Sequence, residues 1–297
     1  MTASPPVLRL VLGFSPGSAS HNVAQAIVPG LAAYLRRQVD LVLHPGESGT
    51  LAARMVAAAP PDGNTLLIAT LGTHALIPAV DPACGYHPLN DFTPISLLLM
   101  APLILAVPSS AGIHSIAALI ERARVADPPL VYGSSAIGGA PHLAAELFAR
   151  RAGVGLHHAR YSDTRQLYVD LVAGRIDLSF NNVMSMLPLI RERRLVPLGT
   201  TSPQPHPALP DVPPIASAGL SGYAVTNWLG VVGPANLQPA AVAEFGAAFA
   251  AAAHKVSTNA ASDIATSTPE AFEMLLRRES ERWTPVLHEL GWARRLG

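Results

Sequence analysis

Two short stretches of small polar residues follow apolar runs that are typical of buried strands. The stretch "SPGSAS" (15–20) follows "LRLVLGF", the stretch "GSSAIGGA" (133–140) begins within "LVYG", and a helical pattern comes after each. Small residues let backbone N–H groups approach a ligand, and a helix start adds unpaired N–H donors with a partial positive charge. Four serine hydroxyls can donate as well, those of Ser18, Ser20, Ser134 and Ser135. This chemistry suits a small anion such as a carboxylate.

Either loop taken alone is also explained as a tight turn in which glycine supplies a positive φ. A third loop, "GESGT" (46–50), is similar. In open α/β sheets, ligands bind outside the carboxyl ends of the strands. Because two such loops occur, one in each half of the chain, the pair favours a binding site over two unrelated turns.

Other chemistries leave weaker signals. The first loop lacks the G-x-x-x-x-G-K-[ST] phosphate motif, and no G-x-G-x-x-G follows the first strand, which argues against a nucleotide. The 11 histidines are scattered without metal-ligand spacing and Cys84 is the single cysteine, so we expect no metal and no other cofactor. The G-x-S-x-G elbow is absent, but a hydrolase that uses Ser134 or Ser135 with His142 stays open as an alternative.

Further polar residues lie where strands end. His74 lies in "LGTHALIP" after the third strand, and His142 opens the helix after the second small-residue loop. Tyr161 and Asn181 end two later strands, where a phenol and an amide can orient a polar ligand. The alternative explanations are a helix start or core packing for the two histidines, and capping of strand ends for Tyr161 and Asn181.

Charge and hydropathy narrow the class of partner. The 20 basic and 20 acidic side chains balance, so no basic face for nucleic acid is expected. The longest apolar run, 95–108, is too short to span a membrane and contains Pro102. No signal-peptide pattern is visible, so we expect either a cytoplasmic protein or a mature chain with an added initiator methionine.

Strands alternate with helices along the chain. The pattern predicts strands at 7–14, 39–45, 64–70, 103–108, 130–133, 156–161, 176–182, 195–202 and 227–234. It predicts helices at 21–37, 50–59, 115–125, 141–153, 164–173, 239–253 and 268–290. This order indicates an α/β fold with a parallel sheet that is covered on both faces.

The length of 297 residues suggests two domains. We expect residues 1–102 and 227–297 to form the first domain, with the C-terminal helices packed back on it. Residues 103–226 are expected to form the second. The two chain crossings near 103 and 227 would then act as a hinge.

The order of the motifs resembles a known family. The segments that carry the resemblance are "FSPGSAS", "PGESGTLAARMVAAAPPDGNTLLIAT", "GTHALIP", "YHPLNDFTPIS", "VYGSSAIGGAPHLAAELF", "YSDTRQLYVDLVAGRIDLSFNN", "HPALPDVP" and "NWLGVVGPANL". They are similar, over almost the whole chain, to the substrate-binding proteins of tripartite tricarboxylate transporters, the Bug type. The segments "APPDGNTLL", "DFTPIS" and "HPALPDVP" in this order are the most specific.

The resemblance implies a two-domain fold like that of the type II periplasmic binding proteins, with a ligand cleft between the domains. It implies a periplasmic solute receptor, not an enzyme, that captures a small carboxylate for membrane transporter subunits. We expect a monomer without nucleic acid or cofactor. A ligand sensor that passes its closed state to a partner protein is the alternative, ahead of the hydrolase.

In this family the carboxylate is held by the first strand–helix loop and by the Ser/Gly loop of the second domain. The expected ligand-binding residues are Phe14, Ser15, Pro16, Gly17, Ser18, Ala19, Thr70, Gly72, Thr73, His74, Ser134, Ser135, Gly138, Gly139, Ala140, Tyr161 and Asn181. The chain departs from the family pattern at five positions, namely Ser18 and His21 in the first loop, Glu47, Asp163 and Asn181. These departures leave the identity of the ligand open.

Overall fold

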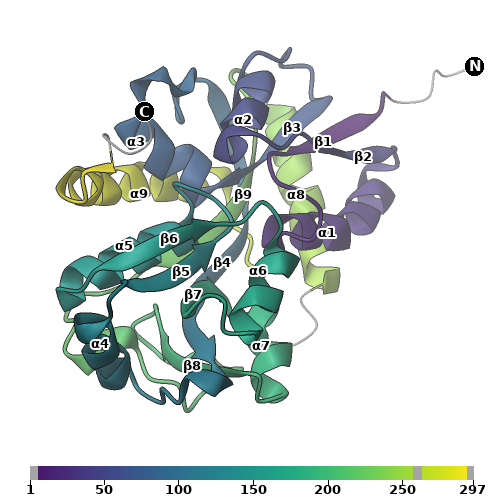
Figure 1. Cartoon of the computed structure of the whole chain (residues 1–297). Coiled ribbons are helices and arrows are strands. Elements are labelled where there is room, and N and C mark those ends of the chain that lie inside the picture. The colour runs from purple at the N-terminus through teal and green to yellow at the C-terminus, as the bar shows by residue number, and fades with distance from the viewer. Residues whose placement is uncertain (1–5, 257–262, 293–297) are drawn as a thin grey trace, which may run out of the picture. The chain divides into compact units, whose positions relative to one another are not determined.

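The computed structural model describes residues 6–256 and 263–292. The chain divides into two compact units, residues 1–100 with 228–297 and residues 101–227. Strand β4 (Phe92–Pro108) and strand β9 (Thr226–Pro234) each carry the chain from one unit to the other (Figure 1). That these crossings act as a hinge stays a prediction.

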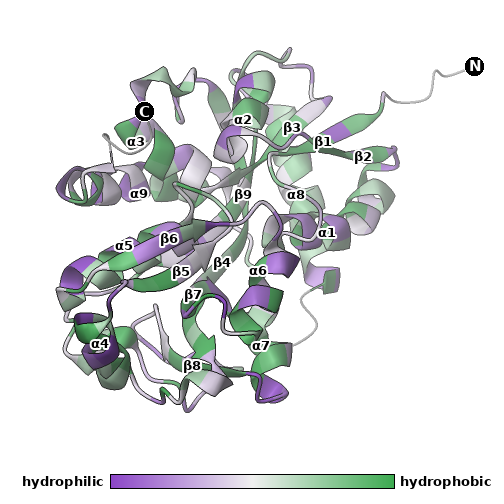
Figure 2. Ribbon diagram, viewed as in Figure 1, coloured by the Kyte–Doolittle hydropathy of each residue, from purple (hydrophilic) through white to green (hydrophobic). Residues whose placement is uncertain are grey.

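The first unit is built on the strand order β2-β1-β3-β9-β4. Its strands besides β4 and β9 are β1 (Leu8–Leu12), β2 (Val39–Leu43) and β3 (Thr65–Thr70). β1 pairs in parallel with β2 and β3, whereas β3 and β9 are antiparallel. All six residues of β3 are buried, and Figure 2 shows hydrophobic colour along β1 and β2. Continuous burial of this kind is expected for strands covered on both faces.

The helices of the first unit cover this sheet. They are α1 (Ala19–Leu35), α2 (Thr50–Ala57), α3 (Ile77–Val80), α8 (Pro239–Val256) and α9 (Pro269–Glu289). Two short 3₁₀ turns, Glu47–Gly49 and Pro82–Cys84, and a π-helix, Gly72–Leu76, complete the unit. α1 packs along α8, and α9 packs against the π-helix and α3. The C-terminal helices therefore do pack back on the first unit.

The second unit has the strand order β6-β5-β7-β4, with β8 on the other side of β4. Its strands are β5 (Leu130–Ser134), β6 (Leu156–Arg160), β7 (Leu178–Asn182) and β8 (Leu195–Thr200). β5 is parallel to β6 and β7, and β4 is antiparallel to β7 and β8. Its helices are α4 (Ile116–Val125), α5 (Ala140–Ala152), α6 (Thr164–Val172) and α7 (Val183–Arg191), with 3₁₀ turns at Ser109–Ala111 and Ile215–Ala218.

Four of the strands and helices differ from the sequence expectation. The strand expected at 103–108 begins at Phe92, because Pro102 lies just before the residues that pair with β7 and β8 and so removes no hydrogen bond from those ladders. Helix α7 was not expected; it contains Pro188, and the burial of Val183, Met186 and Leu187 stabilises it. The π-helix after β3 and the short helix α3 that continues it were not expected either.

Candidate functional site

The first small-residue loop joins β1 to α1 through a tight turn. The N–H of Ser18 donates to the carbonyl of Ser15 at 3.3 Å, and Gly17 has a φ of 81°. Proline in the second position and glycine with positive φ in the third are the signature of a type II turn, which Pro16 and Gly17 supply. Local sequence therefore specifies the shape of this loop.

Two reciprocal hydrogen bonds cap α1. The Ser18 hydroxyl oxygen accepts the N–H of His21 at 3.2 Å, and Nδ1 of His21 accepts the N–H of Gly17 at 3.2 Å. This arrangement resembles a capping box with histidine in the place of Glu or Gln, but His21 accepts the N–H of Gly17, one residue before the N-cap, and not that of Ser18. The N–H groups of Ala19 and Ser20 have no acceptor among the residues that the structure describes. The first turn of α1 can therefore donate to an anion.

Two neighbouring loops of the first unit approach this turn. A Cβ atom added to Gly13 would lie 2.6 Å from Cα of Gly49, which precedes α2. A Cβ atom added to Gly49 would lie 2.9 Å from Cγ2 of Thr73 and 3.1 Å from Cζ of Phe14. The carboxyl ends of β1, β2 and β3 thus bring Phe14 and Thr73, both expected in the site, against Gly49.

A closed network follows β3. The N–H of Thr70 donates to Oγ1 of Thr73 at 3.0 Å, the N–H of Thr73 donates to Oγ1 of Thr70 at 3.1 Å, and Oγ1 of Thr73 lies 3.0 Å from Nδ1 of His74. His74 is fully buried against Phe92 and Tyr86, and desolvation lowers its pKa to about 3. It is a neutral interior residue, and its contact with a ligand stays a prediction.

The second small-residue loop, between β5 and α5, repeats the geometry of the first. The N–H of Gly139 donates to the carbonyl of Ala136 at 3.3 Å, Gly138 has a φ of 79°, and Nδ1 of His142 accepts the N–H of Gly138 at 3.2 Å. Gly139 is the N-cap and supplies no capping side chain. The N–H of Ala140 has no acceptor within the described part of the chain, so α5 also begins with a free donor.

Ser134, at the end of β5, belongs to an aromatic cluster. Its Oγ lies 2.8 Å from Nε2 of His158, whose ring stacks on Tyr132 at 4.8 Å and lies 4.6 Å from that of His142. Burial is the main cause that lowers the pKa of His158. Ser134 has no exposed surface, and the histidine that it contacts is His158 rather than His142, the expected base of a hydrolase.

The side chains of Tyr161 and Asn181 donate hydrogen bonds to other residues of the second unit. The hydroxyl of Tyr161 donates to Oδ2 of Asp170 at 2.8 Å, and burial together with this carboxylate raises the pKa of Tyr161 to about 12. Nδ2 of Asn181 donates to Oγ of Ser179 at 2.9 Å. Sequence reasoning did not find these partners or His158. The residue types and their spacing gave no signal for Asp170, which lies nine residues after Tyr161 on helix α6.

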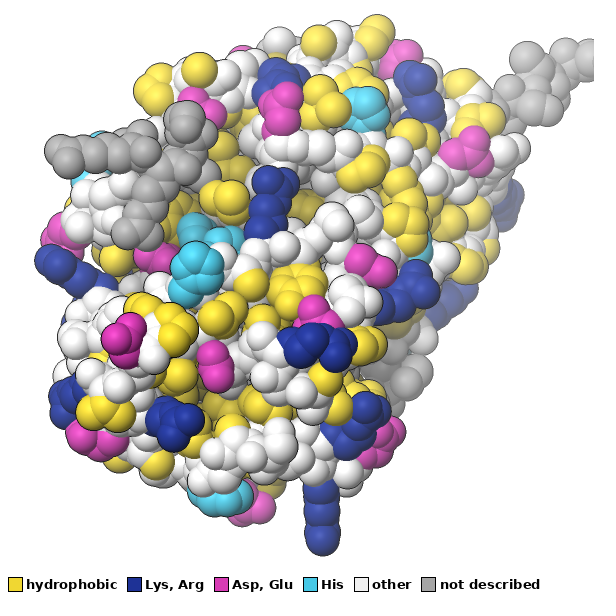
Figure 3. Space-filling model, in the orientation of Figure 1, with side chains coloured by type: hydrophobic (Ala, Val, Ile, Leu, Met, Phe, Trp, Pro, Cys, Tyr) yellow, Lys and Arg dark blue, Asp and Glu magenta, His cyan; other side chains and the backbone are white. Residues whose placement is uncertain are grey.

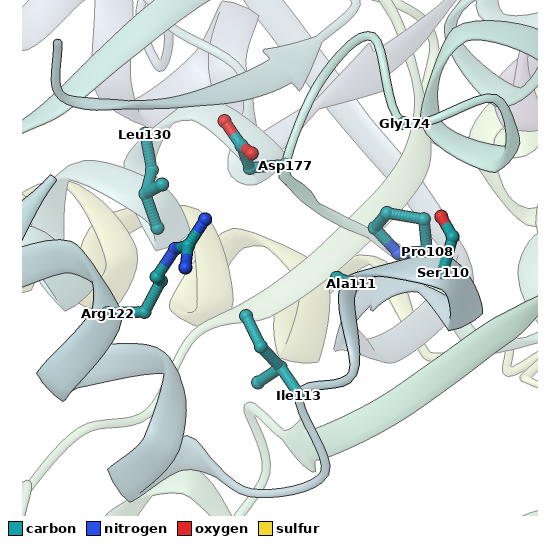
Figure 4. Close-up of a pocket in the computed structure, with 8 residues that line it drawn as sticks. All are labelled: Pro108, Ser110, Ala111, Ile113, Arg122, Leu130, Gly174 and Asp177. Carbon is teal, nitrogen blue, oxygen red and sulfur yellow. The ribbon is translucent and has the colours of Figure 1, made fainter. Parts of the chain in front are cut away.

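A cavity of about 210 Å³ in the second unit lies apart from these loops (Figure 4). It is lined by Pro108, Ser110, Ala111, Ile113, Arg122, Leu130, Gly174 and Asp177. Leu130 is the first residue of β5, whereas Ser134 is its last, so the cavity is at the opposite end of that strand. None of the expected ligand-binding residues lines it.

Charged side chains of both signs are interspersed on the face drawn in Figure 3. Across the described residues, no group of three or more His, Cys, Asp or Glu side chains is placed to hold a metal ion. Among the helices that the structure describes, none combines the length and the apolar character needed to cross a membrane.

The fold is that of the two-domain periplasmic binding proteins. The structure of Rpa4515 from R. palustris with adipate superposes with a TM-score of 0.87 at 30% identity, over 97% of this chain and 98% of that chain. MatC (Rpa3494) from Rhodopseudomonas palustris with bound malate superposes with a TM-score of 0.85 at 26% identity, over 95% and 99%.

Sequence comparison defines the family within this class. The model described as "Tripartite tricarboxylate transporter family receptor" matches residues 23–292. A UPF0065 protein encoded in the tcbD-tcbE intergenic region of Pseudomonas sp. (strain P51) is 34% identical in an alignment of 289 residues that covers 94% of this chain and 84% of that relative. The chain belongs to the tripartite tricarboxylate transporter receptor family. The resemblance noted from the sequence motifs is confirmed.

Proposed function

We propose that this chain is a periplasmic solute receptor that binds a small organic acid on the loops before α1 and α5. The observation that carries the proposal is the repeated helix start, with free N–H groups on Ala19 and Ser20 in one unit and on Ala140 in the other. Neither loop contains Lys or Arg, so the loops themselves offer a carboxylate N–H groups, hydroxyls and helix dipoles.

The ligand class follows from the family. Two structures of similar proteins contain adipate and malate, which are both dicarboxylates. We propose that this chain binds an acid of this class and that the ligand-bound receptor is recognised by the membrane subunits of the transporter. We also propose binding without turnover, because the Ser134 hydroxyl, which among the described residues is the one serine hydroxyl of the second loop that contacts a histidine, is fully buried and a substrate has no access to it in this structure.

Ala19→Pro tests the site by removal of one donor. Ala19 is the first helical residue of α1, a position where proline is tolerated, and Ser18 has the extended backbone (φ −65°, ψ 158°) that precedes proline readily. The substitution deletes the N–H of residue 19 while the helix is retained. Ala19→Ser, which keeps this N–H, is the matched control.

The affinities for adipate and malate are measured by titration calorimetry, with adipamide as the uncharged analogue. We expect parent and Ala19→Ser to bind at least one acid and not adipamide. A charge-assisted hydrogen bond contributes about 1.5–3 kcal/mol, so Ala19→Pro should weaken binding roughly 10- to 150-fold. Equal affinity of Ala19→Pro and Ala19→Ser would remove α1 from the site, and no binding of any acid by the parent would refute the ligand class.

A further inference from the structure

Each of the two small-residue loops is closed by a histidine from the helix that follows it. Nδ1 of His21 accepts the N–H of Gly17, and Nδ1 of His142 accepts the N–H of Gly138, at 3.2 Å in both cases. The glycines have nearly equal φ angles of 81° and 79°. The residue after each glycine also makes the same turn hydrogen bond, at 3.3 Å, in both loops. Each unit therefore contains one turn of this kind, closed by a hydrogen bond from a glycine N–H to a histidine Nδ1.

The hydrogen bond to Nδ1 requires one protonation state and one tautomer of the imidazole. A ring nitrogen accepts a hydrogen bond only when it carries no proton, so Nδ1 must be bare and the proton of the neutral ring must lie on Nε2. A protonated imidazole would have no acceptor for the glycine N–H. It would also place positive charge at a helix start, where the helix dipole disfavours it.

The hydrogen bond determines which N–H groups face a ligand. In a type II turn the third residue does not donate to the turn, so the N–H of Gly17 or Gly138 needs an acceptor elsewhere. With the imidazole as that acceptor, the peptide before the glycine is held in one orientation. The following N–H groups, those of Ala19, Ser20 and Ala140, are then presented in a fixed array.

We propose that His21 and His142 are positioning residues that hold the two anion-binding loops through Nδ1, in the neutral form protonated at Nε2. This inference rests on the proposed function for its ligand, but the hydrogen bonds themselves belong to the protein without ligand. Neither residue needs to touch the acid, because each acts through a glycine N–H.

Nuclear magnetic resonance of the ligand-free protein tests the hydrogen bonds. The ¹⁵N shifts of both imidazoles should report a bare Nδ1 and a protonated Nε2 near neutral pH. Exchange of the Gly17 amide hydrogen should be about 2- to 13-fold faster in His21→Leu, which has no acceptor, because this range corresponds to the net free energy of one hydrogen bond. It should stay near the parent rate in His21→Asn, whose Oδ1 occupies the position of Nδ1.

His142 is buried, so His142→Asn is the variant to use there, with the Gly138 amide as the reporter. If His142→Leu does not fold, the variants of His21, which is only half-buried, still decide the test. Binding of adipate and malate forms a second arm, in which His21→Leu should bind up to about tenfold more weakly than the parent and His21→Asn should be nearly unchanged.

A proton on Nδ1 in the free protein, or an unchanged Gly17 exchange rate in His21→Leu, would overturn the proposal. Equal affinities of His21→Leu and His21→Asn would also overturn the positioning role. If the parent binds neither acid, the proposed function fails, while the ligand-free measurements still decide the state of the histidines.

Discussion

The contact between Gly13 and Gly49 gives the sharpest test of how the candidate site of the first unit is assembled. A methyl group at Gly13 would lie 2.6 Å from Cα and 2.9 Å from the carbonyl oxygen of Gly49. Carbon atoms that are not bonded prefer a separation of about 3.5–4.0 Å, so the new Cβ atom of Gly13→Ala overlaps the backbone of Gly49 by about 1 Å. Neither backbone can rotate away as a flexible side chain would, so the β1–α1 and β2–α2 loops must separate.

Overpacking of a well-packed interior typically lowers the free energy of unfolding by about 1–3 kcal/mol, and we expect a loss of this size for Gly13→Ala. Gly155→Ala is the matched control, because a Cβ atom there has nothing within 4 Å and the backbone angle is ordinary. Exposed substitutions of this kind change stability by no more than about 0.5 kcal/mol. The two variants have the same composition, so the difference between them isolates the contact.

Urea denaturation followed by tryptophan fluorescence measures the effect. All three tryptophans, Trp228, Trp283 and Trp292, lie in the first unit, so the signal reports the unfolding of the unit that contains Gly13. Calorimetry with adipate and malate measures the effect of Gly13→Ala on ligand affinity. Because Gly49 contacts Phe14 and Thr73, the displacement should weaken binding by at least the free energy of one charge-assisted hydrogen bond, which is about tenfold or more.

The reasoning would be refuted if Gly13→Ala unfolded within about 0.5 kcal/mol of Gly155→Ala and bound the acid as tightly as the parent. The loops would then not be in contact in solution. Loss of stability with unchanged affinity would confirm the contact and place the ligand away from these loops.

Three further predictions follow from single contacts. Gly17→Val should weaken acid binding strongly, because Gly17 has a φ of 81° that valine adopts only with strain. Ser18→Ala should weaken binding modestly and lower the free energy of unfolding by about 1 kcal/mol, because the N-cap hydrogen bond is lost. Calorimetry measures both affinities, and circular dichroism verifies that both variants fold. Because the pKa of His74 is lowered to about 3, the folded state binds fewer protons than the unfolded state below about pH 6.5. Stability should therefore fall by about 1.4 kcal/mol per pH unit as the pH drops, and His74→Leu should remove this slope in urea titrations between about pH 6 and 4. Gly230→Ala should destabilise the first unit by about 3 kcal/mol because the new Cβ would lie 2.1 Å from Cζ of buried Phe272 on α9, and an unfolding midpoint equal to that of the parent would contradict this packing.

Local chemistry in the sequence determined the class of fold and the shape of the first loop. The alternation of apolar strands and helices predicts the α/β architecture, because side-chain periodicity reflects which face each element buries. Pro16 and Gly17 specify a type II turn without help from distant residues. The hydrogen bonds that link Ser18, His21 and Gly17 were not predicted, because a histidine stands where a capping box has Glu or Gln.

Tertiary structure decided which residues are free to meet a ligand. Tyr161 ends its strand as expected, yet its hydroxyl is taken by Asp170, and the Ser134 hydroxyl is taken by His158. The approach of Gly13 to Gly49 likewise joins two separate loops. The contacts of Ser134 with His158 and of Gly13 with Gly49 arise when separate strands align in one sheet, and that of Tyr161 with Asp170 arises when α6 packs beside its strand. Spacing along the sequence does not encode these contacts. The sequence alone therefore identified the loops and the family, whereas the packed structure determined which donors in those loops stay free.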